Sequence, residues 1–363
     1  MIGQLSDIAR QGLFLFDPET AHGLSIAALK SGLLPPCPVK DDPRLAQTVA
    51  GLSFPNPLGM AAGYDKNAEV PDALLRLGFG FTEVGTLTPR PQAGNPKPRI
   101  FRLTADRAVI NRLGFNNEGH EAAHASLSAR KHTGGVVGVN IGANKDSEDR
   151  VADYVAGIRR FASLASYFTV NISSPNTPGL RDMQARESLK ALLDAVLAAR
   201  AEETARLGRP LPVFLKIAPD LPEEGLDDIA AEALAHDLDG LIVANTTLSR
   251  AGLTDGAQAG EAGGLSGAPL FRLSTAVLAK MRQRVGGSLP IIGVGGVGSA
   301  QDALEKIRAG ADLVQLYSCM VYEGPGFPGR ILADLSRLLD REGVASIRDL
   351  RDSGVAQWAA TKL

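Results

Sequence analysis

The sequence contains a serine and several asparagines whose positions suit chemistry on a small polar ring. Ser174 lies in the segment 171–176, which reads Asn-Ile-Ser-Ser-Pro-Asn and follows a short apolar run. Asparagine offers both a donor and an acceptor, so several of them suit a neutral ring with alternating C=O and N–H groups. A single asparagine at a strand end is usually a turn former, whereas three at equivalent positions favour ligand contacts. Such runs end at Asn140, Asn171 and Asn245, and loops add Asn111 and Asn176.

Two lysines stand where an anion would be needed. Lys66 ends the segment Gly-Tyr-Asp-Lys at 63–66, and Lys216 lies inside the apolar run Val-Phe-Leu-Lys-Ile at 213–217. A lysine within a buried strand is costly unless an anion or an acceptor meets it. Lys216 therefore predicts a bound anionic group, such as a reduced flavin.

Other kinds of site find no support in the sequence. None of the five histidines stands in a Ser-His-acid pattern, which disfavours acyl transfer by a catalytic triad. No His-Glu-x-x-His or comparable metal pattern occurs, so we expect no metal. Cys37 and Cys319 are too far apart in sequence to suggest a disulfide framework, which favours a reducing compartment.

A glycine-rich segment at 293–298 fits the G-x-G-x-x-G spacing of dinucleotide-binding folds. Those folds carry the motif after their first strand, whereas here it follows the seventh apolar run. In a barrel, loops after strands seven and eight hold phosphate groups on backbone N–H groups. A second glycine-rich loop at 263–267 favours phosphate binding over the alternative that these glycines only form tight turns.

The elements that must position these residues alternate along the chain. Eight short apolar runs, separated mostly by helical patterns, predict a parallel α/β sheet, and eight strands close a (β/α)₈ TIM barrel. Two longer segments at 88–117 and 248–267 are candidate substrate loops at its carboxyl-terminal face. The predicted strands are 58–62, 81–84, 136–140, 168–172, 213–217, 241–244, 291–294 and 313–316.

Residues 1–34 form a separate pattern of two short amphipathic helices with a break at Asp17-Pro18. Such a hairpin could lie in a membrane interface, or it could pack on its own domain. We expect no signal peptide and no membrane span, because the start is acidic and no apolar run is long enough. The prediction is an N-terminal extension at 1–40 and a barrel domain at 41–363.

The composition restricts the kinds of partner that we expect the protein to bind. The 38 Lys and Arg residues balance 40 Asp and Glu residues, giving a net charge of −2, whereas nucleic-acid binders normally carry a basic excess. Hydrophobic residues make up 44% of the chain, enough for a large core.

The motifs together resemble those of class 2, quinone-linked dihydroorotate dehydrogenases over nearly the whole chain. Relatives that use soluble acceptors have Asn-x-Ser-Cys-Pro-Asn at strand four, with cysteine as the catalytic base, whereas this chain has Ser174. The N-terminal helical pair is similar to the class 2 extension, which docks on the membrane and lines the quinone entrance. The segments that carry the resemblance are 16–22, 62–66, 109–116, 140–145, 171–179, 245–247 and 264–267.

The resemblance implies an FMN-binding barrel that oxidises dihydroorotate to orotate in pyrimidine (UMP) biosynthesis. Ala244 stands where Thr or Ser is common in relatives, which puts a local backbone contact in doubt. The implied FMN contacts are Ala62, Gly63, Lys66, Thr86, Asn140, Asn171, Lys216, Ala244, Gly267, Gly296, Tyr317 and Ser318. The implied substrate contacts are Lys66, Asn111, Arg112, Leu113, Gly114, Phe115, Asn171, Asn176, Asn245 and Thr246.

The resemblance also implies a mechanism. Ser174 would remove the C5 proton, and hydride would leave C6 for the flavin. Thr177 and Phe115 would shape a proton path beside this base, and Lys216 would stabilise the reduced flavin. His22, Arg102 and Tyr317 would lie at the quinone entrance.

The partner would then be a membrane quinone. The protein would attach peripherally to the cytoplasmic side of an inner membrane. No obligate protein partner is expected. Two alternatives remain: a related pyrimidine-reducing flavoprotein with a soluble acceptor, and a non-catalytic flavin-barrel binding protein.

Overall fold

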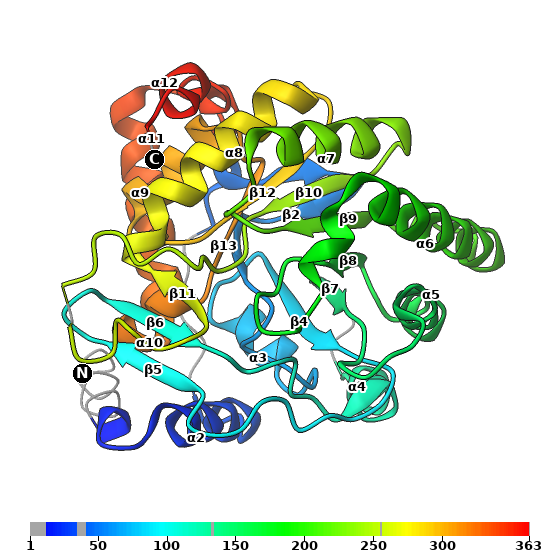
Figure 1. Ribbon diagram of the computed structural model, residues 1–363. Helices are drawn as coiled ribbons and strands as arrows, with labels where there is room; N and C mark the ends of the chain where they lie inside the picture. The colour runs from blue at the N-terminus through cyan, green and yellow to red at the C-terminus, as the bar shows by residue number, and fades with distance from the viewer. Residues whose placement is uncertain (1–11, 35–40, 132–133, 255, 363) are drawn as a thin grey trace.

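A closed barrel of eight parallel strands forms the centre of the protein (Figure 1). The computed structural model describes residues 12–34, 41–131, 134–254 and 256–362. Going round the barrel, the strands follow the order of the chain, and the last one pairs with the first. They are β3 (Leu58–Met60), β4 (Phe81–Leu87), β7 (Val136–Ile141), β8 (Tyr167–Asn171), β9 (Val213–Ile217), β10 (Gly240–Val243), β12 (Ile291–Val294) and β13 (Leu313–Leu316).

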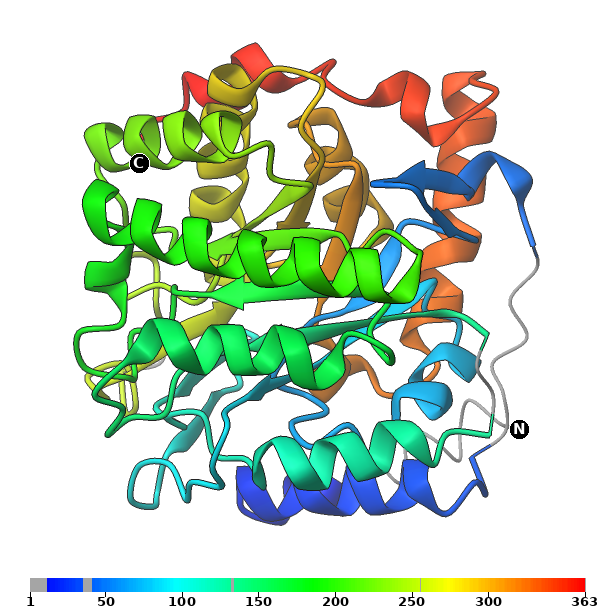
Figure 2. The same ribbon diagram turned by 90° about the vertical axis from the view of Figure 1, so that its right-hand side faces the viewer.

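The predicted (β/α)₈ barrel is confirmed, and β9, β12 and β13 have the predicted bounds. Helices cover the outside of the barrel, with α5, α6 and α7 stacked along one side (Figure 2). The helices after the N-terminal segment are α3 (Pro71–Arg76), α4 (Gly119–Ser128), α5 (Arg150–Phe161), α6 (Arg186–Leu207), α7 (Glu223–Ala235), α8 (Phe271–Val285), α9 (Ala300–Arg308), α10 (Ser318–Glu323), α11 (Phe327–Glu342) and α12 (Val355–Ala359). Short 3₁₀ helices are η1 (Pro43–Leu45), η2 (Arg181–Gln184), η3 (Ala268–Leu270) and η4 (Ile347–Leu350).

Aromatic rings fill the amino-terminal half of the barrel because neighbouring strands carry glycine beside them. A Cβ atom on Gly138 would lie 2.1 Å from Cζ of Tyr167, and one on Gly59 would lie 2.3 Å from Cζ of Phe81. A hairpin of β1 (Gln47–Val49) and β2 (Leu52–Phe54) closes this end, with the Phe54 ring 5.2 Å from that of Phe81. The interior is packed here, so a ligand site can form only towards the carboxyl ends of the strands.

The two long insertions contain strands that their polar and glycine-rich composition did not indicate. The segment 88–117 holds the hairpin of β5 (Ile100–Leu103) and β6 (Ala108–Asn111), and 248–267 ends in β11 (Gly264–Gly267). Strand β6 lies between the other two, and all three pair antiparallel. These candidate substrate loops are therefore joined into one small sheet (Figure 1).

The N-terminal helix α2 (Pro18–Lys30) packs against β5 and α3. As expected at the predicted break, Asp17 caps α2 by accepting hydrogen bonds from two backbone N–H groups, and Pro18 is its first residue. Arg99 is buried and pairs with Glu19 of α2 at 2.7 Å, which ties the helix to the barrel domain. Most of the first predicted helix, and Cys37, lie outside the described residues.

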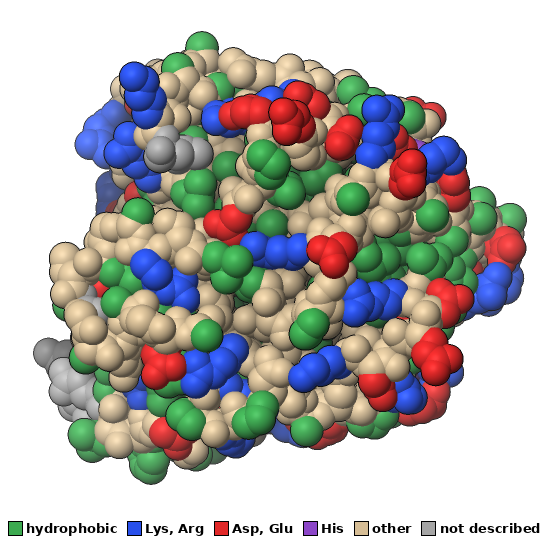
Figure 3. All heavy atoms as spheres, in the orientation of Figure 1, with side chains coloured by type: hydrophobic (Ala, Val, Ile, Leu, Met, Phe, Trp, Pro, Cys, Tyr) green, Lys and Arg blue, Asp and Glu red, His purple; other side chains and the backbone are tan. Residues whose placement is uncertain are grey.

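In the part of the chain that the structure describes, no helix is both long and apolar enough to cross a membrane. The division at residue 40 stays a prediction. Basic and acidic side chains are interspersed on the face that Figure 3 shows, in keeping with the balanced charge.

Candidate active site

A cavity of about 880 Å³ lies between the carboxyl ends of the barrel strands, the small sheet and helix α2. Its wall combines residues that are far apart in the sequence and that were predicted from the sequence to act together. Those lining it are His22, Ala62, Gly63, Lys66, Thr86, Arg102, Asn111, Leu113, Gly114, Phe115, Asn171, Ser174, Asn176, Lys216, Ala244, Asn245, Thr246, Gly267, Gly296, Tyr317 and Ser318.

Hydrogen bonds between the carboxyl ends of different barrel strands fix the asparagine side chains. The Ser173 hydroxyl donates to Oδ1 of Asn171 at 2.7 Å and accepts from Nδ2 of Asn245 at 2.8 Å. Nδ2 of Asn171 donates to the Thr86 hydroxyl at 2.9 Å. Because each amide has a defined partner, its orientation towards the cavity is set before any ligand binds.

Three predicted site residues do not line this cavity. Asn140 lies behind Thr86, whose hydroxyl donates to Oδ1 of Asn140 at 2.6 Å, and Nδ2 of Asn140 donates to the buried Glu83 at 2.7 Å. Arg112 pairs with Glu261 at 2.7 Å. Thr177 is buried, and its hydroxyl has no hydrogen-bond partner among the described residues.

Ser174 is buried at the cavity, with 5% of its surface exposed. Its hydroxyl oxygen accepts a hydrogen bond from the backbone N–H of Asn176 at 3.2 Å. No histidine or carboxylate among the described residues hydrogen-bonds this hydroxyl. Nδ2 of Asn176 lies 3.4 Å from Oδ1 of Asn111, so two predicted substrate contacts, one from the loop after β8 and one from the end of β6, meet beside the serine.

The substrate segment 111–115 is held in a specific backbone shape. Phe115 has a φ of 55°, a left-handed conformation that is uncommon outside glycine. Its carbonyl accepts hydrogen bonds from Nε2 of Gln92 at 3.1 Å and Nδ2 of Asn117 at 2.7 Å. These contacts hold the Phe115 ring against Gly142, where an added Cβ would lie 3.2 Å from that ring.

Lys216 is 5% exposed and makes no hydrogen bond or ion pair with any described residue. Burial lowers the pKa of its ammonium group, while the negative charge of Glu83 acts in the opposite direction. A buried cation that faces a cavity without a partner fits an anionic ligand. The loops of Gly267 and Gly296 have φ values of 97° and 77°, which glycine adopts without strain, and they bring backbone close to the same cavity. The residues therefore fit an anionic flavin carrying a phosphate group.

The N-terminal helix reaches this site through His22. Nε2 of His22 lies 3.2 Å from Nζ of Lys66, and Nδ1 lies 3.5 Å from the hydroxyl of Tyr317. Burial and the nearby Lys66 lower the pKa of His22 to about 3, so its imidazole is neutral at pH 7. Burial lowers the pKa of Lys66 to about 8.

Arg102 lies at the outer part of the cavity, with its guanidinium 4.8 Å from the centre of the Phe14 ring. It also donates a hydrogen bond to the backbone carbonyl of Phe16. The three residues predicted for the quinone entrance thus line the cavity that Lys216 and Ser174 also line.

Sequence reasoning assigned no role to several residues that line the cavity or support it from behind, and Tyr64 is one that lines it. Ser173 and Tyr64 stood within motifs that were noticed, but neither received a role. Tyr64 hydrogen-bonds Ser25 of α2 at 3.0 Å. Glu83 and Arg181 gave no signal, because their partners are distant in sequence: Glu83 accepts from Nε2 of Gln315 at 2.8 Å.

Comparisons with known proteins all indicate one family. The family model described as dihydroorotate dehydrogenase matches residues 44–339. Proteins named dihydroorotate dehydrogenase (quinone) are 76% identical over 363 residues in Allorhizobium ampelinum and 77% identical over 364 residues in Rhizobium etli (strain CIAT 652), covering 100% of both chains in each case. The ligand-free DHODH structure from Eimeria tenella is 41% identical with a TM-score of 0.88, covering 93% of this chain and 99% of that one.

Proposed function

The chain belongs to the dihydroorotate dehydrogenase family, and we propose that it oxidises dihydroorotate to orotate in pyrimidine biosynthesis, with FMN as the hydride acceptor and a membrane quinone as the final electron acceptor. The observation that carries this proposal is one cavity lined by Ser174, the unpartnered Lys216 and His22 of the N-terminal helix.

The asparagines recognise the pyrimidine ring. Asn111, Asn171, Asn176 and Asn245 present amide donors and acceptors to the C=O and N–H groups of dihydroorotate. Lys66 supplies a positive charge for the substrate carboxylate. A neutral residue at position 66 would leave the asparagines free to bind the ring equally well. It would leave the carboxylate without a counter-charge.

Ser174 acts as the base that takes the proton from C5. Bound FMN would supply the acceptor for the hydride that leaves C6 and would carry two electrons to the quinone. The loss of a proton and a hydride leaves the C5=C6 double bond of orotate. A serine needs help to act as a base, because its hydroxyl is weakly basic near neutral pH. The buried hydroxyl of Thr177, which has no partner among the described residues, offers a next position for the proton.

Lys216 supplies a positive charge inside the cavity, where water is largely excluded. A charge placed in advance stabilises negative charge that develops nearby at no cost in rearrangement. The glycine loops at Gly267 and Gly296, together with Ser318, would hold the phosphate group of FMN.

The N-terminal segment forms the quinone entrance and attaches the protein to a membrane. It contributes apolar residues such as Leu13 and Ala28 to the cavity that His22 lines. It also holds four of the six large hydrophobic side chains found exposed among the described residues, namely Leu15, Phe16, Leu24 and Leu33. Exposed apolar side chains along one segment fit a lipid surface. We propose peripheral attachment, on the cytoplasmic side of the inner membrane.

Identification of the released cofactor and comparison of electron acceptors test this proposal. We expect the purified protein to release FMN and to turn over dihydroorotate with a quinone much faster than with fumarate or a nicotinamide. Turnover with a soluble acceptor alone would favour a related flavoprotein of another class. A colourless protein would favour a non-catalytic barrel.

A further inference from the structure

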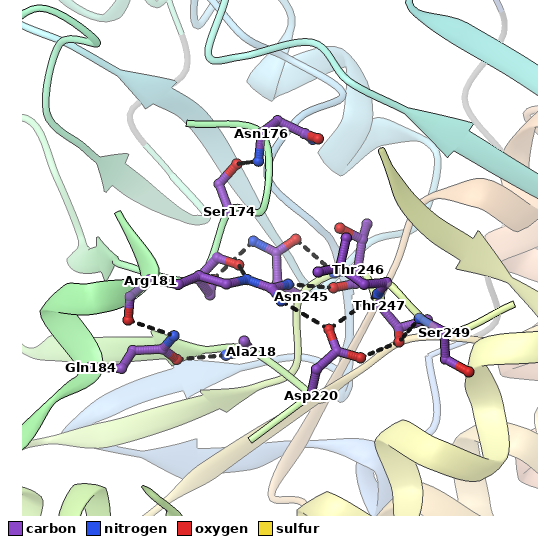
Figure 4. A network of polar contacts seen from close by, with 12 residues as sticks. Ser174, Asn176, Arg181, Gln184, Ala218, Asp220, Asn245, Thr246, Thr247 and Ser249 are labelled. Atoms are coloured by element: carbon purple, nitrogen blue, oxygen red, sulfur yellow. Dashed lines mark hydrogen bonds and ion pairs between the residues drawn. The ribbon is translucent and has the colours of Figure 1, made fainter. Parts of the chain in front are cut away.

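Two loops, one with the predicted base Ser174 and one with the predicted substrate contacts Asn245 and Thr246, meet at the guanidinium of Arg181 (Figure 4). Arg181 begins η2, which follows the Ser174 loop. Nε of Arg181 donates to the carbonyl of Ser173 at 3.0 Å, and Nη2 donates to the carbonyl of Thr246 at 3.0 Å. One side chain therefore holds the residue before the proposed base and the residue after Asn245.

Asp220, in the loop after β9, holds the guanidinium from a third direction. Its carboxylate pairs with Nη1 of Arg181 at 2.9 Å, and both side chains are 21% exposed. The same carboxylate accepts hydrogen bonds from the backbone N–H of Leu248 at 3.1 Å and from the hydroxyl of Thr247. The loops after β8, β9 and β10 are thus joined through one ion pair.

The shape of arginine suits this arrangement. A guanidinium is planar and rigid, with five donors at fixed angles, so three acceptors on separate loops fix its position and it fixes theirs. Backbone carbonyls do not move independently of their neighbours in the chain. Displacing Arg181 would therefore shift Ser174 relative to Asn245 without removing either side chain.

We propose that Arg181, oriented by Asp220, is a positioning residue that sets the distance between the base Ser174 and the substrate ring held by Asn245. This inference rests on the proposed function. It assigns Arg181 to the proton-transfer half of the reaction, and not to cofactor binding, since Arg181 does not line the cavity.

The expected effect is a slower reduction of the bound flavin at saturating dihydroorotate. A misplacement of about 1 Å can cost on the order of 100-fold in rate, so we expect Arg181→Gln and Asp220→Asn to slow the step by roughly 10- to 100-fold. Arg181→Lys should recover part of the loss, because one ammonium group can still reach some of the acceptors.

Rapid mixing without oxygen, using dihydroorotate deuterated at C5 or at C6, provides the test. A badly placed base makes removal of the C5 proton more limiting, so the isotope effect from C5 deuterium should rise relative to that from C6 deuterium. FMN content should match that of the wild type. Arg200→Gln is the matched control: Arg200 pairs with Asp239 at 3.0 Å with similar exposure, beside the start of β9.

The inference is overturned if Arg181→Gln and Asp220→Asn reduce flavin at the rate of Arg200→Gln, or if they slow it with an unchanged ratio of isotope effects. Asp220→Asn decides the matter if Arg181→Gln does not fold. Failure of the wild-type holoprotein to be reduced by dihydroorotate would instead refute the proposed function, and the role of Arg181 with it.

Discussion

Nε2 of His22, on the N-terminal helix, lies 3.2 Å from Nζ of Lys66, the lysine proposed to meet the substrate carboxylate. The low pKa of His22, about 3, keeps the imidazole neutral, so it can accept a hydrogen bond from the Lys66 ammonium. The side of the cavity assigned to quinone therefore contacts the side assigned to substrate and cofactor through one hydrogen bond.

The affinity for orotate should fall at high pH. Burial lowers the pKa of Lys66 to about 8, so its positive charge is present below that pH and is lost as the pH rises above it. The affinity should decrease by roughly tenfold for each pH unit above 8, as the charged fraction does. Titrating the holoprotein with orotate, followed by flavin absorbance, measures this. Lys66→Gln should bind weakly with no such pH dependence; an unchanged pH dependence in that variant would exclude Lys66.

Replacing Ser174 by alanine should slow flavin reduction by dihydroorotate. A general base typically contributes roughly 10²- to 10⁴-fold in rate, and Ser174→Ala removes it while leaving the asparagines in place. Rapid mixing at neutral pH measures the step, and orotate affinity serves as the control, since it should change little. A near wild-type rate would remove Ser174 from this role.

Acidic substitutions in the N-terminal segment should release the protein from membranes. Leu15 and Leu33 are 88% and 85% exposed, and a charge at either position would have to be desolvated in a lipid interface. Leu15→Glu combined with Leu33→Glu should reduce binding to vesicles of phosphatidylethanolamine and phosphatidylglycerol in a sedimentation assay. Leu234→Glu, on α7 and 45% exposed, is the control. Equal binding by all the variants would place the membrane contact elsewhere.

An added methyl group inside the barrel should destabilise the fold. In Gly138→Ala the new Cβ would lie 2.1 Å from Cζ of the buried Tyr167, so we expect a loss of about 1–3 kcal/mol in the free energy of unfolding. Denaturant unfolding measures the difference. Gly134→Ala, where nothing lies within 4 Å of the new Cβ, should be close to neutral. If both variants matched the wild type, this packing of the barrel interior would be incorrect.

The barrel could be predicted from the sequence because its strands are continuous apolar runs, as expected for a parallel sheet buried on both faces. The small sheet of β5, β6 and β11 could not be predicted in this way. Strand β11 reads Gly-Leu-Ser-Gly, which has little intrinsic strand preference, and it is a strand because β6 offers it a free edge. Composition alone therefore indicated a loop.

Some residues of the candidate site could likewise be predicted from the sequence, and others could not. Residues at or just after strand ends, such as Asn171 and Asn245, could be predicted because barrel geometry brings strand ends together. Asn140 is the residue before the last of β7, but its amide is turned towards Glu83 behind Thr86. The pairing of Arg181 with Asp220 joins residues 39 positions apart, and no local pattern indicates which acidic residue an arginine meets.

The most direct test of the account follows the two half-reactions of the wild-type holoprotein without oxygen. Dihydroorotate should bleach the absorbance of the bound flavin, and a quinone added afterwards should restore it, whereas fumarate or a nicotinamide should not. A flavin that stays oxidised after dihydroorotate is added would contradict the account.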